Sequence, residues 1–347
     1  MLKSRRRQPK SIVGLDLDSS HLAAAQVEVN GQIVVTKGAV ADLRPGILRD
    51  GEVADPVALT EELRKLFTEN ELPTHVRIGV ANQRIVVRTL DVAAVDEPKL
   101  LEGLVRDAAP DHIPVPMDEA ILDFQPLGRV ETESGPRTRV LIVAVRRDMI
   151  ERLVASANEA GLSIAGIDLS AFAMIRALRT PGSEHASLYI NLAGLTNVAV
   201  ANDAGCLFTR AAAGGLDSML KSLVEARGLT VEHARGWMHH VGLTTPLDAI
   251  EGDPELVAAV RQSLDEGVHA VADTVRNSLN FYRMQDSAET VEDAVLTGSA
   301  VAIPGFAETL SEQLRIPVGS AHVAGPSDGV DLDRLTVAAG LALEDTP

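Results

Sequence analysis

One arrangement of secondary structure occurs twice along this sequence of 347 residues, and this repetition constrains the fold more than any other feature. In each copy, two apolar runs joined by a polar turn are followed by a third run and then a helix. The predicted strands cover 11–17, 23–29 and 32–40 in the first copy and 187–192, 197–202 and 206–210 in the second. The helices begin after Asp55-Pro56 and at Gly214-Gly215. Two such copies predict an α/β fold with two related lobes that face each other.

The segment between the two copies has a different pattern. It contains predicted strands at 85–90 and 140–145, a helix near 98–108, and a polar hairpin tip at 131–139. A further helix starts at Asp148 and ends at Gly161. We therefore expect a small inserted α+β subdomain. The predicted division is a basic disordered tail (1–10), the first lobe (11–83), the insertion (84–165), a return helix of the first lobe (166–185) and the second lobe (186–345).

Charge and composition limit the class of function. The formal net charge of −17 repels phosphate backbones, so we expect no nucleic-acid partner. The first ten residues carry five basic side chains and no acidic one, which predicts a disordered tail; contact with anionic lipid is the alternative role. The sequence has neither an apolar run of transmembrane length nor a signal peptide, which indicates a cytoplasmic protein. Cys206 is the single cysteine, so an internal disulfide is ruled out.

Four elements could together hold a nucleotide between the lobes. Phosphate binding needs backbone N–H groups that point at the ligand, and magnesium needs a carboxylate. Both hairpin turns, a glycine pair before a helix, and a glycine after a buried strand supply such groups. The candidate residues are Asp16, Asp18, Ser19, Ser20, Asn191, Gly194, Thr196, Gly214, Gly215, Gly298 and Ser299. Each element is an ordinary turn when taken alone, but their order favours a site for ATP with Mg²⁺, with Asp16 on the metal side.

The same order of motifs carries a family resemblance. The motifs are the hairpin 14–20, the segment 110–116 with Asp123-Phe124, the segments 160–162 and 167–169, the stretches 210–215 and 276–285, and Gly298 with 304–306. They span nearly the whole chain. Together they resemble the PilM family, which is part of the actin-like superfamily that includes FtsA and sugar kinases.

This resemblance implies a fold, a ligand and a partner. The fold would be an actin-like (ribonuclease H-like) two-lobe α/β structure with a small α+β subdomain inserted in the first lobe. The ligand would be ATP with Mg²⁺. The implied partner is the cytoplasmic tail of a PilN-like inner-membrane protein, which would place the chain at the inner face of that membrane during type IV pilus assembly. The resemblance also leaves self-association open.

The sequence departs from the family pattern at several positions of the expected site. Asp18 stands where the family hairpin has glycine, and Ala23 stands where it usually has lysine. Asn191 replaces an aspartate, and an amide cannot act as a carboxylate base. Ala193, Leu195 and Ser299 replace a glycine, a hydroxyl residue and a glycine. We therefore assign no catalytic residue and predict weak or absent hydrolysis, with at most a weak ATPase.

Other readings use the same fold. An FtsA-like cell-division protein would polymerise and would carry a C-terminal amphipathic helix, which the terminal residues do not predict. A small-molecule kinase of the superfamily would need a carboxylate facing the γ-phosphate, and Asn191 weakens that reading. A type II secretion homologue would carry a membrane span.

Overall fold

The computed structural model describes residues 12–133, 135–180, 182–183, 185–285, 288–326 and 330–343. The predicted basic tail (1–10) lies outside these residues. The chain divides into two compact units: Met1–Ala81 with Ser156–Pro347, called here the two-lobe unit, and Asn82–Ala155, called here the inserted unit. Among the described residues, no helix combines the length and apolar character needed to span a membrane.

The first lobe is built on a five-stranded sheet with the order β10-β6-β1-β2-β3. Its strands are β1 (Val13–Leu17), β2 (His21–Val29), β3 (Ile33–Asp42), β6 (His75–Val80) and β10 (Ser163–Leu169). Two short strands, β4 (Leu48–Arg49) and β5 (Glu52–Val53), form a hairpin beside it. Strand β1 pairs antiparallel with β2 and parallel with β6, so the first predicted hairpin is confirmed. Its turn, at residues 18–20, carries the candidate site residues.

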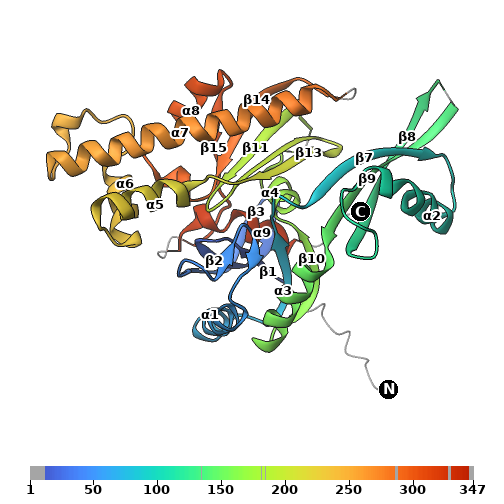
Figure 1. Ribbon diagram of the computed structural model, residues 1–347, viewed down its shortest axis with the longest axis horizontal. Helices are drawn as coiled ribbons and strands as arrows, with labels where there is room; N and C mark the ends of the chain where they lie inside the picture. Colours follow the sequence, from blue (N-terminus) through green and yellow to red (C-terminus); the bar gives the residue numbers. More distant parts are fainter. Residues whose placement is uncertain are drawn as a thin grey trace. The chain divides into compact units, whose positions relative to one another are not determined.

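Close backbone packing holds the helices of the first lobe on this sheet. Helix α1 (Pro56–Glu69) begins where the sequence predicts, because the Asp55 side chain accepts from the Ala58 N–H. Helices α4 (Ser170–Leu178) and α9 (Thr336–Ala342) pack against each other, and α9 also packs on β1 and β2, as Figure 1 shows in red against blue. A Cβ on Gly340 would lie 1.9 Å from the Ala173 carbonyl oxygen. Only glycine allows so close an approach.

The second lobe repeats the plan with the strand order β13-β12-β11-β14-β15. Its strands are β11 (Ala186–Leu192), β12 (Thr196–Asn202), β13 (Gly205–Ala212), β14 (Val291–Thr297) and β15 (Val318–Ser320). Strand β11 is buried along its whole length. Leu188 and Ile190 pack in the core of the second lobe, whereas Tyr189 packs with α4 and α9. The sheet is therefore covered on both faces, which explains the continuous apolar run in the sequence.

Helices of the second lobe bury the outer face of this sheet. They are α5 (Leu216–Arg227), α6 (Val231–Val241), α7 (Pro254–Arg283) and α8 (Phe306–Leu314), with short 3₁₀ turns at Leu247–Ala249 and Ser299–Ala302. A further 3₁₀ turn, Leu332–Arg334, precedes α9, and its Leu332 packs against the core of the first lobe. Asp253 caps α7, and Pro254 takes its first position. Figure 1 shows α7, in orange, running along the sheet, where it contacts β12 and β13. Helix α5 starts at the predicted glycine pair, with Gly215 as its N-cap.

The inserted unit has its own core. A three-stranded antiparallel sheet has the order β7-β9-β8, with β7 at Val86–Ala93, β8 at Ala120–Thr132 and β9 at Gly135–Arg146. Helix α2 (Pro98–Ala108), followed by a 3₁₀ turn at Ala109–Asp111, packs its apolar side against this sheet. Helix α3 (Arg147–Glu159) leads out of the inserted unit.

Two segments differ from the secondary structure expected from the sequence. Residues 166–169 were expected in a return helix, but they end strand β10, which pairs parallel with β6. This strand is only partly buried, so its sequence lacks a clear alternation of apolar and polar residues. The predicted polar hairpin tip at 131–139 is also shorter than expected, because β8 extends to Thr132 and β9 begins at Gly135.

Candidate functional site

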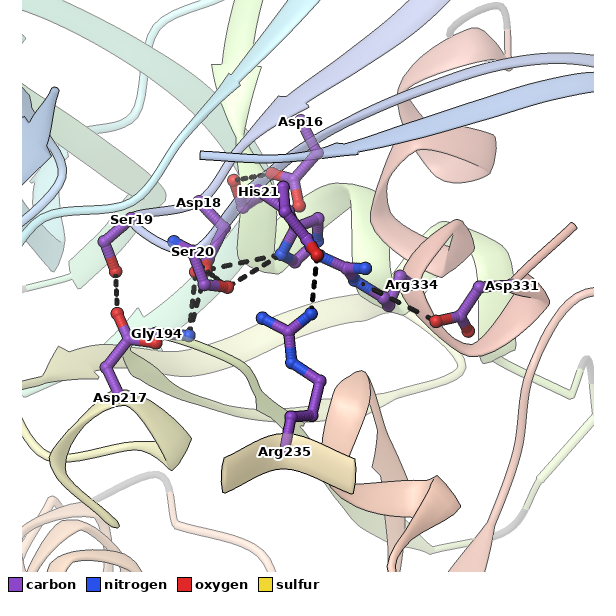
Figure 2. A network of polar contacts seen from close by, with 12 residues as sticks. Asp16, Asp18, Ser19, Ser20, His21, Gly194, Asp217, Arg235, Asp331 and Arg334 are labelled. Atoms are coloured by element: carbon purple, nitrogen blue, oxygen red, sulfur yellow. Dashed lines mark hydrogen bonds and ion pairs between the residues drawn. The ribbon is translucent and has the colours of Figure 1, made fainter. Parts of the chain in front are cut away.

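The turns of the two predicted hairpins meet, and the Asp18 carboxylate joins them (Figure 2). The Gly194 N–H of the second hairpin donates to both oxygens of Asp18, at 3.0 and 3.1 Å. Within the first turn, the Ser20 N–H donates to Asp18 Oδ1 at 2.9 Å and the Ser20 hydroxyl at 2.6 Å. His21 Nδ1 lies 3.5 Å from the same oxygen. Burial alone raises the pKa of Asp18, but His21 and the Ser20 donors outweigh it and lower the pKa to about 2.

A second hydrogen bond connects the lobes beside the first. The Ser19 hydroxyl donates to Asp217 Oδ2 at 2.7 Å, and Asp217 lies in the first turn of α5 (Figure 2). Burial raises the pKa of Asp217, and the charge of Asp18 raises it further. Between these two contacts lies Gly194, where an added Cβ would fall 1.8 Å from Ser19 Oγ. The hairpins therefore approach each other as closely as a residue without a side chain allows.

Asp16 lies behind this contact, at the end of strand β1. Its carboxylate is buried and accepts a hydrogen bond from the Ser170 hydroxyl at 3.1 Å. Burial raises its pKa to about 6, and the negative charge of Asp18 adds to this effect, although His21 and Ser170 oppose it. Carboxylates with a pKa raised this far are often found at functional sites.

The remaining predicted residues lie around the second hairpin. Thr196 donates from its hydroxyl to the Gly214 carbonyl oxygen at 2.6 Å. A Cβ on Gly215 would lie 2.3 Å from the Ala193 carbonyl oxygen. Gly298 has a φ of 87°, and a Cβ there would lie 2.3 Å from Asn191 Oδ1.

Ser299 begins the 3₁₀ turn that follows Gly298. The structure thus brings Asp16, Asp18, Ser19, Ser20 and Gly194 together. Asn191 lies beside Gly298, and Thr196, Gly214 and Gly215 surround the base of the second hairpin.

A cavity of about 750 Å³ opens beside the two turns. It is lined by residues of both lobes, among them Ser19, Ser20, Gly194, Gly214 and Asp217. Basic side chains also reach it, namely Arg44, Arg49, Lys221 and Arg235.

One of these basic side chains connects the lobes at the edge of the cavity. Arg235 of α6 binds Asp42, at the end of β3, at 2.8 Å, and Arg334 binds the other oxygen of Asp42 at 2.5 Å. These arginines outweigh the effect of burial and lower the pKa of Asp42.

The donors around Asp18 suit an anion, whereas the acids around them suit a cation. The Gly194 and Ser20 N–H groups converge on one carboxylate, and a phosphate oxygen would accept the same bonds. Asp16 and Asp18 lie close enough for their charges to interact. Within the part of the chain that the structure describes, no group of three or more acidic, histidine or cysteine side chains could hold a metal by itself.

Comparison with known proteins identifies the family. The model described as "Type IV pilus assembly protein PilM" matches residues 14–346. The chain belongs to the PilM family. This match covers both lobes and the inserted unit, so the family resemblance predicted from the sequence motifs is confirmed.

Solved structures show the same fold for this PilM-family chain. A structure of a PilM-PilN type IV pilus biogenesis complex matches with a TM-score of 0.77 and 23% identity, covering 96% of this chain and 97% of that chain. The ethanolamine utilization protein EutJ from Carboxydothermus hydrogenoformans matches with a TM-score of 0.56 and 16% identity, covering 96% and 90%. MreB5 of Spiroplasma citri, solved with ADP, matches with a TM-score of 0.54 and 12% identity, covering 96% and 95%. The predicted actin-like fold is confirmed.

Several residues of this PilM-family site were missed by the sequence analysis. Asp217 binds Ser19 across 198 positions of sequence, and Arg235 binds Asp42 across 193. Ser170, which donates to Asp16, was also absent from the predicted site. Asp217 lies two positions after Gly215, so its place at the start of α5 was the one local signal available.

Proposed function

We propose that this PilM-family chain is a cytoplasmic adaptor that docks the cytoplasmic tail of a PilN-like inner-membrane protein during type IV pilus assembly. The observation that carries the proposal is the family match over residues 14–346, which includes the inserted unit as well as both lobes. The similarity to a chain in a PilM-PilN complex supports the class of partner. Through that partner, the chain would be held at the inner face of the membrane.

The proposal includes a nucleotide in the cavity between the lobes. The N–H groups of Gly194 and Ser20 would hold a phosphate, while Gly214, Gly215 and Gly298 would let the backbone approach the ligand. The other predicted contacts are Ser19, Asn191, Thr196 and Ser299. Asp16 would face the magnesium ion, whose positive charge would also offset the energetic cost of the buried carboxylate. Bound ATP with Mg²⁺ would supply a ligand that both lobes contact.

Hydrolysis would be weak or absent. Asn191 ends strand β11 beside Gly298, and its amide can orient a water but cannot remove a proton from it. The chain would therefore act by binding, and a nucleotide could change partner affinity only to the extent that it prefers one arrangement of the lobes.

The domain organisation of the proposal follows the division expected from the sequence, with different boundaries. The inserted unit, Asn82–Ala155, would form the functional insertion in the first lobe, because Ser163–Leu169 forms strand β10 of that lobe, and residues 1–10 would form a basic tail. A protein without residues 1–10 should keep its affinity for the partner peptide. A loss of affinity on deletion would assign the tail to the docking surface.

A titration with the partner peptide tests the adaptor proposal. The purified chain is titrated by calorimetry with the cytoplasmic tail of a PilN-like protein, with a scrambled peptide of the same composition as control. Saturable binding of the native peptide alone supports the proposal. Equal binding of both peptides, or of neither, contradicts it. The same titration is repeated with ATP and Mg²⁺ for the native chain and for Asp16→Asn, and a change in peptide affinity that requires Asp16 supports the nucleotide part.

A further inference from the structure

The Asp18 carboxylate occupies an anion-binding arrangement of backbone groups. Its side chain is 9% exposed, and it accepts hydrogen bonds from two N–H groups and one hydroxyl. One of those N–H groups belongs to Gly194 of the other lobe, which donates to both carboxylate oxygens. These contacts keep Asp18 ionised although it is buried. The Asp18 carboxylate therefore accepts the hydrogen bonds that an anionic ligand bound between the two turns would accept.

The position of Gly194 leaves no room for Asp18 and a second anion together. A Cβ on Gly194 would lie 2.8 Å from Asp18 Oδ1 and 2.8 Å from Asp217 Oδ2. The space in front of the Gly194 N–H is also filled, because both carboxylate oxygens of Asp18 accept from this group at 3.0 and 3.1 Å. A phosphate oxygen can reach this donor only if the Asp18 side chain turns away.

The negative charges around the Gly194 N–H also oppose the binding of a phosphate. Asp16 is buried and Asp217 is half-buried beside Asp18, and the charge of Asp18 raises the pKa of both. Ala23 of strand β2 is fully buried and brings no positive charge to the turn. An entering phosphate would therefore meet three carboxylates at the turn.

We propose that Asp18 is an internal anion that fills the site formed by the N–H groups of Gly194 and Ser20, called here the Gly194–Ser20 cradle. In this position Asp18 clamps the two hairpins together without a ligand. The phosphate of any nucleotide that binds must displace it. This inference rests on the proposed nucleotide site and adds its regulation. The clamp keeps the lobes together without a nucleotide, and it lowers the affinity for phosphate-containing ligands. Ser19 adds a second connection, but its hydroxyl bonds Asp217 and leaves the cradle unchanged.

Two substitutions of Asp18 separate charge from space. Asp18→Asn keeps the shape and one acceptor oxygen but removes the charge, whereas Asp18→Gly empties the cradle. Ser19→Ala is the matched control because it removes an interlobe hydrogen bond without opening the cradle. Each variant is first compared with the native chain by circular dichroism, and the partner peptide titration reports whether its docking surface is intact.

Nucleotide affinity is the first readout. Full-length protein is titrated with ATP and with tripolyphosphate, each with Mg²⁺, so that binding of the phosphate chain is distinguished from binding of the base. We expect Asp18→Gly to bind both ligands at least tenfold more tightly than the native chain, Asp18→Asn to lie between them, and Ser19→Ala to show no gain. Equal affinity of the native chain and Asp18→Gly, or binding by neither, overturns the proposal.

Hydrogen exchange at the Gly194 amide is the second readout. In the native chain without ligand this amide should exchange slowly because Asp18 accepts its hydrogen. In Asp18→Gly it should exchange at least tenfold faster and regain protection when tripolyphosphate is added. An unchanged exchange rate in Asp18→Gly contradicts the clamp. Retained peptide binding in that case leaves the adaptor function standing, so the two failures can be told apart.

Discussion

The buried carboxylate of Asp16 should reduce the stability of the ligand-free protein at neutral pH. Its pKa is raised from 3.8 to about 6, so the folded state holds the proton more tightly than the unfolded state. Stability from this group is therefore fully present below pH 3.8 and is lost as the pH rises through 6. The shift of about 2 pKa units corresponds to about 3 kcal/mol at pH 7.5 and to about 1 kcal/mol at pH 4.5.

Asp16→Asn tests this reasoning directly. The amide oxygen can still accept the hydrogen bond from Ser170, but no charge has to be buried. We expect the free energy of unfolding to rise by about 3 kcal/mol at pH 7.5 and by about 1 kcal/mol at pH 4.5. Urea unfolding followed by the fluorescence of Trp237, the single tryptophan, reports the two-lobe unit. Asp265→Asn on the exposed side of α7 is the matched control and should change neither value.

Either of two results would refute the argument. A gain that is the same at both pH values would show that packing, not charge, is responsible. A loss of stability at pH 7.5 would show that the Asp16 charge is already compensated in the ligand-free protein. The predicted gain comes with a loss, since Asp16→Asn should also weaken ATP binding with Mg²⁺ if the carboxylate faces the metal.

Three further predictions concern packing, acid stability and the edge of the cavity. Gly340→Ala should lower the free energy of unfolding by about 1–3 kcal/mol because of its contact with α4, whereas Gly236→Ala, which faces open space on α6, should raise it by about 0.5–1 kcal/mol; urea titrations at pH 7.5 measure both. Asp18→Asn should remove the loss of stability, about 2 kcal/mol, that the native chain shows as the pH falls from 3.8 towards 2, measured by urea titrations across that range. Arg235→Ala should cost less than about 1 kcal/mol, and less still at 1 M salt, because its partner Asp42 is half exposed; a salt-independent loss would contradict the ion-pair reading.

Local patterns were enough to predict the elements that carry the site. Asp55-Pro56 marked the start of α1, Gly214-Gly215 preceded α5, and the apolar run 187–192 indicated strand β11. These features depend on caps, on turn residues and on the burial of one continuous run. Strand β10 was missed because a partly buried edge position imposes no strong pattern on the sequence.

Contacts between distant positions could not be predicted in the same way. The unusual Asp18 was recognised as an extra negative charge in the turn, but not as the acceptor for Gly194, 176 positions away. Likewise, nothing in the sequence around Ser19 specifies Asp217 as its partner. Such contacts depend on how the two lobes pack together, and many segments far apart in the chain contribute to that packing.

The charge at the hairpin turn separates the two parts of the proposed function. A site optimised for phosphate would have a cation beside the turn, whereas here Asp16 and Asp217 lie beside Asp18 of the turn. The lobes are nevertheless joined by three contacts that need no ligand, at Gly194, Asp217 and Arg235. Since these contacts are made by the chain's own residues, the partner surface can be present without ATP. We therefore expect the native chain to bind the PilN-like tail at nearly full affinity without nucleotide, and Asp18→Gly to be the variant in which ATP changes that affinity most.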